Sequence, residues 1–117
     1  MEYAKLGKTD IEVSRLCVGC MSFGRPGTLH DWTVDETETE KIVKHALDLG
    51  INFFDTANGY SDGTSEEYLG RAIRKNVPRD KVVIASKVYF NPGRISAEAI
   101  SREIEGSLKR LGTDYLD

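Results

Sequence analysis

Three side chains in the middle of the chain are of types that together can deliver a proton: Asp55, Tyr60 and Lys87. A free tyrosine has a pKa of about 10, which is too high for an efficient acid near neutral pH. A neighbouring ammonium stabilises a phenolate and lowers that pKa, and a carboxylate beside the ammonium keeps the ammonium charged. Such a cluster can give a proton to an oxygen on which negative charge develops, as the reduction of a carbonyl group requires.

Each of these residues also has an ordinary structural interpretation. Asp55 follows two phenylalanines, and aspartate is common in turns. Lys87 can extend its ammonium from a buried strand to solvent, and Tyr60 can pack its ring on the surface of a loop. Neighbouring parallel strands lie about 4.8 Å apart, however, so their carboxyl ends can place a carboxylate against an ammonium. We therefore predict an Asp55–Lys87 ion pair at the mouth of a sheet, with the Tyr60 hydroxyl near the Lys87 amine.

The pattern of apolar residues predicts the strands that would position these side chains. Short strands at 3–6 and 11–13 are expected to form a hairpin around a glycine-containing loop. Apolar runs at 16–21, 51–55 and 82–87 predict three further strands. The run at 16–21 does not alternate, which is typical of a strand buried on both faces.

Three helices are expected between and after these strands. The first covers about 35–49 behind a capping-box pattern at 33–36, and the second follows a capping-box pattern at 64–67. Ser96 is expected to cap the third helix and Gly112 to end it. The third helix carries an apolar stripe formed by Ile100, Ile104, Leu108 and Leu111.

The order strand, loop, helix occurs three times, which predicts an α/β fold with a parallel sheet. Ligands bind beyond the carboxyl ends of the strands in such folds, so the segments 20–22, 55–60 and 87–91 are candidates for a site. Residues 115–117 are expected to open a fourth strand. A closed barrel of these units takes about 250 residues, so we expect the chain to be the first part of a larger domain.

The composition narrows the classes of function. The 117 residues suit one domain, and the net charge of −3 gives no electrostatic reason to bind nucleic acid or anionic lipid. No apolar run approaches the roughly 20 residues of a membrane helix, and the first dozen residues lack a signal-peptide core. Two cysteines without an export signal favour a reduced, cytoplasmic setting.

Cys17 and Cys20 have the C-x-x-C spacing of redox and zinc motifs. Both fall in a predicted strand, where an odd offset turns the two side chains to opposite faces. A zinc site would need a second pair of ligands, and the sequence offers none. We expect no metal site here. The sequence also lacks both familiar phosphate-binding glycine motifs.

Several motifs resemble the aldo-keto reductase superfamily, and they follow one another in order along the whole chain. They are LGKTD at 6–10, NFFDTANGY at 52–60, SEEYLGRA at 65–72, ASKV at 85–88 and SLKRLGTDYLD at 107–117. The sequence looks nearest to bacterial reductases allied with the potassium-channel β-subunits. The resemblance implies a (β/α)8 TIM barrel whose base is plugged by an N-terminal hairpin. Residues 1–117 would form the N-terminal part of that single barrel domain, namely the hairpin and about three βα units.

The resemblance also implies NADPH-dependent reduction of aldehydes and ketones to alcohols. Asp55, Tyr60 and Lys87 match three members of the family's catalytic tetrad, with Tyr60 as the proton donor. The stretch from Gly19 to Ser22 would contact the nicotinamide ribose.

The cofactor-binding residues implied by the resemblance are therefore Gly19, Cys20, Met21, Ser22 and Asp55. The implied partner is a small-molecule carbonyl substrate, without nucleic acid or membrane, and a homo-oligomer is compatible with the sequence.

Two parts of the family pattern have no counterpart within the 117 residues. One is the fourth tetrad member, a histidine at the end of the fourth strand, and the other is the set of later loops that hold the pyrophosphate and the 2′-phosphate. We therefore expect the chain alone to be inactive. Two alternatives stay open: a dinucleotide-binding regulatory subunit of the channel β-subunit type, and an inactive fragment that is stable only in an assembly.

Overall fold

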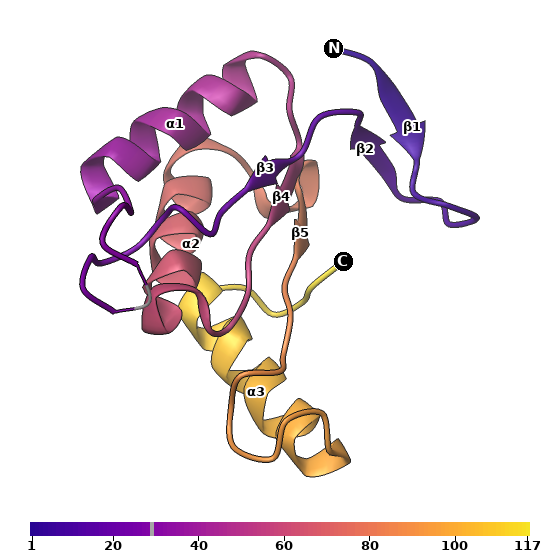
Figure 1. Cartoon of the computed structure of the whole chain (residues 1–117). Helices are drawn as coiled ribbons and strands as arrows, with labels where there is room; N and C mark the ends of the chain where they lie inside the picture. The colour runs from indigo at the N-terminus through magenta and orange to yellow at the C-terminus, as the bar shows by residue number, and fades with distance from the viewer. Residues whose placement is uncertain (29) are drawn as a thin grey trace.

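The computed structural model describes residues 1–28 and 30–117, which form a hairpin, a parallel sheet and helices that follow its strands (Figure 1). The strands are β1 (Tyr3–Lys5), β2 (Glu12–Ser14), β3 (Val18–Gly19), β4 (Phe53–Asp55) and β5 (Val83–Ala85). The helices are α1 (Glu36–Asp48), α2 (Thr64–Asn76) and α3 (Ala97–Leu111), and short 3-10 turns occupy Tyr60–Gly63 (η1) and Arg79–Lys81 (η2).

The parallel sheet has the order β3-β4-β5, and its register aligns the strand ends that carry the candidate site. Gly19 of β3 pairs with Asp55 of β4, and Asp55 pairs with Ala85 of β5. Phe54, at the centre of β4, is buried among the apolar side chains of α1 and α2. The carboxyl ends of the three strands therefore lie at one edge of the sheet, as the repeated order of strand, loop and helix predicts.

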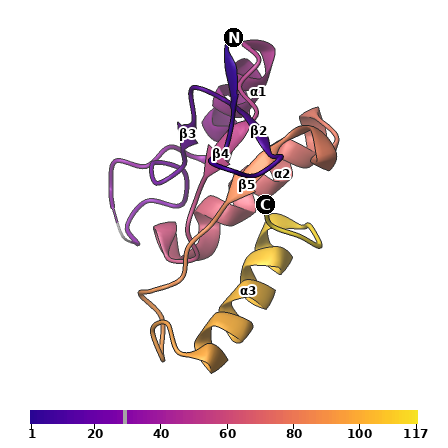
Figure 2. The same cartoon turned by 90° about the vertical axis from the view of Figure 1, so that its right-hand side faces the viewer.

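The helices cover the sheet with α2 packed against both α1 and α3. Figures 1 and 2 show α3 at the opposite end of the molecule from the hairpin β1–β2. A Cβ on Gly70 would clash with the backbone carbonyl oxygen of Leu111, so only glycine allows α2 and α3 to approach this closely. The core consists of buried side chains from the sheet and the helices: Cys20, Phe23, Val43, Ala46, Phe54, Leu69, Ala72, Ile73, Val82, Ile84 and Leu111.

The predicted strand at 16–21 is shorter and more exposed than its apolar run indicates. Only Val18 and Gly19 pair with β4, and the flanking Leu16 and Met21 are exposed. β3 lies at the edge of the described sheet, with β4 on one side. The prediction that this run is buried on both faces is therefore wrong for the structure described.

Residues 115–117 are not assigned as a strand, although they lie beside one. The backbone N–H of Asp117 donates to the carbonyl of Ile84 at 3.3 Å, and its carboxylate accepts from the N–H of Ile84 at 3.0 Å. Arg79 of η2 also holds the Asp117 carboxylate at 2.7 Å. This segment thus runs along β5 at the position expected for a following strand.

The helix caps differ from the predicted ones in two of three cases. α1 begins after Asp35, whose side chain accepts a hydrogen bond from the N–H of Glu38 at 2.9 Å. Thr33 cannot take that role because the next residue, Val34, is held in a β-bridge with Phe23, so the chain is still extended there.

α2 follows directly on the turn η1, and its N-cap residue is Gly63, with a φ of 90° and no side-chain cap. The Thr64 hydroxyl donates back to the carbonyl of Ser61 at 2.6 Å. The third prediction is confirmed: Ser96 accepts from the N–H of Ala99, and Gly112 ends α3 with a φ of 68°.

A charge pair joins α1 to α2 and makes part of this contact pH-dependent. Arg71 donates to both carboxylate oxygens of Glu36, at 2.6 and 2.9 Å. This hydrogen bonding is the main reason that the pKa of Glu36 lies below its ordinary value of 4.5. A carboxyl group with a lowered pKa stabilises the fold above its ordinary pKa, and that contribution is lost as the pH falls through the lowered value.

We therefore expect Glu36→Gln to destabilise the protein by under about 1 kcal/mol at pH 7, because both side chains are 45% exposed. The difference between wild type and Glu36→Gln should shrink when urea unfolding is repeated at pH 3. Glu38→Gln is the matched control, since Glu38 pairs with Lys41 within α1. A difference that stays constant between pH 7 and pH 3 would show that the Glu36 charge is not its source.

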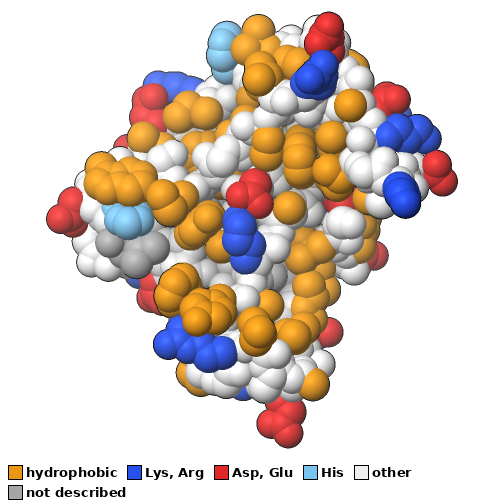
Figure 3. All heavy atoms as spheres, turned by 45° about the vertical axis from the view of Figure 1, so that its right-hand side comes forward, with side chains coloured by type: hydrophobic (Ala, Val, Ile, Leu, Met, Phe, Trp, Pro, Cys, Tyr) orange, Lys and Arg blue, Asp and Glu red, His pale blue; other side chains and the backbone are white. Residues whose placement is uncertain are grey.

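Large apolar side chains remain exposed over the described surface, and Figure 3 shows hydrophobic side chains spread over one face between charged ones. The predicted stripe of α3 is only partly buried: Leu111 is in the core, whereas Ile100 and Ile104 are exposed.

Candidate active site

The predicted ion pair lies at the carboxyl end of β4 and β5. Lys87 Nζ lies 2.7 Å from Asp55 Oδ2 and also donates to the carbonyl of Thr56 at 2.8 Å. The Thr56 N–H in turn donates to the carbonyl of Ala85, which continues the β4–β5 pairing beyond the strand end. Parallel pairing thus fixes the lysine and the carboxylate against each other, and the predicted pair is confirmed.

Tyr60 reaches the same point from the loop after β4. Its hydroxyl lies 3.4 Å from Lys87 Nζ, and the Nζ atom lies 5.0 Å from the centre of its ring. Tyr60 begins the turn η1, in which Ser61 and Asp62 have positive φ values of 49° and 56°. This tight turn returns the chain toward the sheet, so the three side chains meet as predicted.

The ammonium at the centre of this cluster is held in its charged form. Burial lowers the pKa of Lys87, but the hydrogen bonds to Asp55 and Tyr60 and the negative charge of Asp55 outweigh that effect, so the pKa lies above its ordinary value of 10.5. The cluster therefore presents a fixed positive charge beside the phenol oxygen of Tyr60 throughout the neutral pH range.

A cavity of about 300 Å³ lies over this cluster. Its lining is mainly apolar and consists of Met21, Ala57, Asn58, Gly59, Tyr60, Lys87, Tyr89 and Phe90. Lys87 and Tyr60 supply its reactive polar groups, and Tyr89 and Phe90 form an aromatic wall with ring centres 4.9 Å apart in an edge-to-face arrangement. A cavity of this kind suits a carbonyl compound whose oxygen meets the tyrosine and whose body meets aromatic rings.

The residues of the predicted cofactor-binding stretch differ in their exposure to solvent. Gly19 is exposed at the end of β3, Met21 lines the cavity, and Ser22 is half-buried. Cys20 is fully buried, its N–H donates to the Asp55 carbonyl, and its own carbonyl accepts from Ser65. The side chain of Cys20 therefore belongs to the core, while Gly19 and Met21 stay accessible.

The two cysteines are free thiols, with Cys17 exposed and Cys20 buried. Within residues 1–28 and 30–117, no cluster of three or more His, Cys, Asp or Glu side chains is arranged to hold a metal ion.

Two elements of the site were missed by sequence reasoning. The aromatic wall falls inside the candidate segment 87–91, but residue type alone gave Tyr89 and Phe90 no role. Glu66 lies in the second predicted capping pattern, yet its carboxylate accepts from Ser86 at 2.7 Å and from Arg110 at 2.6 Å. Ser86 directly precedes Lys87, so this buried carboxylate supports the strand end that carries the lysine.

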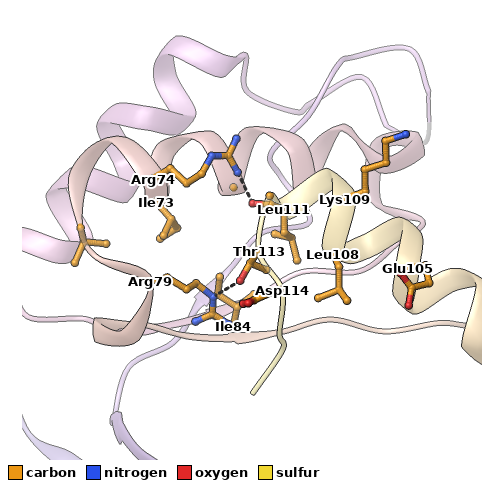
Figure 4. Close-up of a pocket in the computed structure, with 13 residues that line it drawn as sticks. Ile73, Arg74, Arg79, Ile84, Glu105, Leu108, Lys109, Leu111, Thr113 and Asp114 are labelled. Atoms are coloured by element: carbon orange, nitrogen blue, oxygen red, sulfur yellow. Dashed lines mark hydrogen bonds between the residues drawn. The ribbon is translucent and has the colours of Figure 1, made fainter.

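A larger cavity, of about 870 Å³, lies elsewhere, between α2, α3 and residues 112–114 (Figure 4). In Figure 4, Arg74 donates to the carbonyl of Leu111 and Arg79 donates to Thr113. None of Asp55, Tyr60 and Lys87 lines this cavity. Size alone would therefore have pointed away from the candidate site.

No helix in the described part of the chain is both long enough and apolar enough to cross a membrane.

Comparison with known proteins identifies relatives over the whole chain. Versiconal hemiacetal acetate reductase of Aspergillus parasiticus is 37% identical over 100% of this chain and 40% of its own length. Aldo-keto reductase YhdN of Bacillus subtilis is 41% identical over 100% of this chain and 36% of its own length. The chain thus spans about 40% of the length of the relatives that it matches.

A solved structure shares both sequence and fold. The thermostable aldo-keto reductase Tm1743, solved in complex with the inhibitor epalrestat, is 34% identical and superposes with a TM-score of 0.80. The match covers 100% of this chain and 41% of that one, which identifies the described sheet and helices as part of a TIM barrel. The sequence model of the aldo/keto reductase family matches residues 15–117, and the chain belongs to the aldo/keto reductase family.

Proposed function

We propose that the chain carries the proton-donating part of a carbonyl reductase site, in which Tyr60 protonates the oxygen of an aldehyde or ketone. The observation that carries this proposal is the position of Lys87 Nζ, 2.7 Å from Asp55 Oδ2 and 3.4 Å from the Tyr60 hydroxyl. An oxygen that gains negative charge beside this hydroxyl receives its proton from Tyr60. The fixed ammonium of Lys87 then stabilises the negative charge that Tyr60 takes up.

Asp55 acts through Lys87. Its carboxylate keeps the ammonium charged and directs the Nζ atom, and the Thr56 carbonyl takes a second Nζ proton at 2.8 Å. The ion pair is partly exposed, so a closed barrel around it would reduce solvent screening and strengthen its effect on Tyr60. We therefore assign proton donation to Tyr60 and charge stabilisation to Lys87, with Asp55 as the residue that positions the lysine.

The accessible residues at the end of β3 fit the nicotinamide end of NADPH. Among the described residues, no atom outside the neighbouring positions lies within 4 Å of the point that a Cβ on Gly19 would occupy. Met21, two residues further along the chain, has an exposed side chain that lines the cavity. An open backbone surface beside an apolar side chain can receive a flat ring. When bound there, NADPH would supply the hydride, and Gly19, Met21 and Ser22 would hold its nicotinamide ribose.

A chimera tests this proposal, because it supplies the rest of a barrel. In this barrel chimera, residues 1–117 replace the matching 41% of Tm1743, whose thermostability gives tolerance to the exchange. We expect the barrel chimera to oxidise NADPH in the presence of nitrobenzaldehyde.

The control is the unmodified Tm1743 barrel under the same conditions. A folded barrel chimera that binds NADPH without turning over the aldehyde would contradict the proposal. That result would favour a dinucleotide-binding module of the regulatory type instead.

A further inference from the structure

Asn58 lies in the loop between Asp55 and Tyr60, and it connects that loop to two other segments. Its side-chain Nδ2 lies 2.8 Å from Glu103 Oε1 on α3 and 3.1 Å from Asn91 Oδ1 in the segment after β5. Its backbone N–H donates to the carbonyl of Lys87 at 3.1 Å. One residue thus joins the tyrosine loop, the segment that follows the lysine, and α3.

The backbone and the side chain of Asn58 hold different parts of the site. The backbone bond to Lys87 survives any substitution that keeps the N–H group, and Lys87 Nζ is held separately by Asp55 and Thr56. Within residues 1–28 and 30–117, the side-chain amide, by contrast, bonds only to residues beyond Lys87. Removing this amide should therefore release the segment after Lys87 without releasing the lysine itself.

The segment beyond Lys87 carries the aromatic wall. Asn91 Nδ2 donates to the carbonyl of Arg94 at 3.0 Å, and the Arg94 guanidinium lies 5.0 Å from the Tyr89 ring centre and 5.7 Å from that of Phe90. Phe90 is 83% exposed, so packing alone does not fix it. A Cβ on Gly59 would lie 3.9 Å from Phe90 Cβ, which puts the base of this side chain directly beside the tyrosine loop.

The bond between Asn58 and Glu103 has the character of a strong hydrogen bond. It is the main reason that the pKa of Glu103 lies below its ordinary value of 4.5, so this carboxylate stays ionised at neutral pH. The Glu103 side chain is 19% exposed, and Arg102 lies on its other oxygen at 3.2 Å. Hydrogen bonds to an ionised acceptor are shorter and stronger than those between neutral groups.

We propose that Asn58 is a positioning residue whose side-chain bonds to Asn91 and Glu103 fix the Tyr89–Phe90 wall beside the Tyr60 hydroxyl. α3 thereby takes part in selecting carbonyl substrates with bulky aromatic bodies. Small aliphatic aldehydes, which do not reach the wall, do not depend on this contact. The expected effect on KM rests on the proposed function of Tyr60. The expected loosening of the segment after Lys87 rests on the hydrogen bonds of Asn58 alone.

The kinetic test compares nitrobenzaldehyde with propanal in the barrel chimera. Loss of a hydrogen bond to a charged group should raise the KM for nitrobenzaldehyde about tenfold in Asn58→Ala. The kcat with either aldehyde and the KM for propanal should stay near wild type, because Lys87 and Tyr60 keep their own contacts. Asn76→Ala is the matched control, since Asn76 Nδ2 bonds to the carbonyl of Ala72 at 2.8 Å, away from the cavity.

A reversal of donor and acceptor tests the specific contact. Asn58→Asp places a second carboxylate against Glu103, so it should raise the KM for nitrobenzaldehyde more than Asn58→Ala does. Combining Asn58→Asp with Glu103→Gln lets the new amide donate to the new carboxylate. The double variant should therefore recover the part of the loss that comes from the contact with residue 103, whereas the bond to Asn91 Oδ1 stays absent. A loss of activity that is equal for both aldehydes, or a double variant no better than Asn58→Asp, would overturn the inference.

Hydrogen–deuterium exchange tests the structural part without any need for turnover. The N–H groups of Arg94 and Ser96 donate to the carbonyls of Asn91 and Gly93 at 3.1 and 2.9 Å. These two amides should exchange faster in Asn58→Ala, while the Thr56 amide, bonded to Ala85, should not. If the wild-type barrel chimera binds NADPH without turnover, the proposed function fails. The exchange rates of the Arg94 and Ser96 amides still test whether Asn58 positions the aromatic wall. Unchanged exchange at Arg94 and Ser96 would overturn the inference.

Discussion

Tyr60→Phe is expected to lower the kcat of the barrel chimera by about 10²–10⁴ with either aldehyde, because a positioned general acid is removed. The phenylalanine ring keeps the apolar contacts of the tyrosine ring, including its place 5.0 Å from Lys87 Nζ. NADPH affinity should therefore remain close to wild type. Negative charge that develops on the substrate oxygen then finds no proton donor, and the closed barrel of the chimera limits the water that could replace it.

Steady-state kinetics and NADPH titration should be measured on the same preparation of Tyr60→Phe. Tyr68→Phe is the matched control, because Tyr68 is a half-buried tyrosine on α2 whose ring lies under Arg71, away from the cavity. If Tyr60→Phe retains a kcat near that of wild type, another residue donates the proton and the assignment to Tyr60 is wrong.

Glu66→Gln is expected to destabilise the fold by about 3 kcal/mol, because it removes one partner of a buried ion pair. The Glu66 side chain is 0% exposed and accepts from Arg110 at 2.6 Å, so the substitution leaves the partly buried guanidinium without its counter-charge. The hydroxyl of Ser86, which donates to the same carboxylate at 2.7 Å, also loses a charged acceptor. The midpoint of urea unfolding of the barrel chimera measures this effect.

Two further variants separate the lost charge pair from a general effect of substitution. Glu67→Gln changes the next residue of α2, which makes no ion pair among the described residues, and should leave the midpoint within about 0.5 kcal/mol of wild type. Combining Glu66→Gln with Arg110→Met should cost less than Glu66→Gln alone, because no unpaired charge then remains. A double variant that is less stable than the single one would contradict this account.

The Asp55–Lys87 pair could be predicted because it follows from one regular feature of the chain. Two apolar runs each end close to a charged residue, and neighbouring parallel strands bring such ends together. The register of Asp55 against Ala85 then places Lys87 within reach of the carboxylate. Local sequence order and one rule of sheet geometry were enough, so no long-range contact had to be known in advance.

The helix starts could not be predicted from local patterns alone. Thr33 and Thr64 both stand three residues before a glutamate, which is the spacing of a capping box. The bridge of Val34 to Phe23 is a tertiary contact that keeps the chain extended before α1. The Thr64 hydroxyl accepts from the N–H of Arg25 and donates to the carbonyl of Ser61, so it does not cap α2. Ser96 caps α3 as predicted because only local contacts within its own turn are involved.

The contacts of Glu66 with Arg110 and of Asn58 with Glu103 could not be predicted from the sequence for a similar reason. Glu66 and Arg110 are separated by 44 positions, and Asn58 and Glu103 by 45. A glutamate in the first turn of a helix and an asparagine in a loop are ordinary choices at those places, so neither residue type signals its distant partner. Only the packing of α3 against α2 and the sheet brings each pair together.

The most direct test of the proton-donating cluster is a double-mutant cycle of Tyr60→Phe and Lys87→Met on kcat in the barrel chimera. Lys87→Met should itself reduce turnover severely, because it removes the ammonium that lies 3.4 Å from the Tyr60 hydroxyl. Residues that act as one unit give strongly non-additive effects, so the double variant should be little slower than Tyr60→Phe alone. A double variant slower by the full product of the two single effects would contradict the account, since Tyr60 and Lys87 would then act independently.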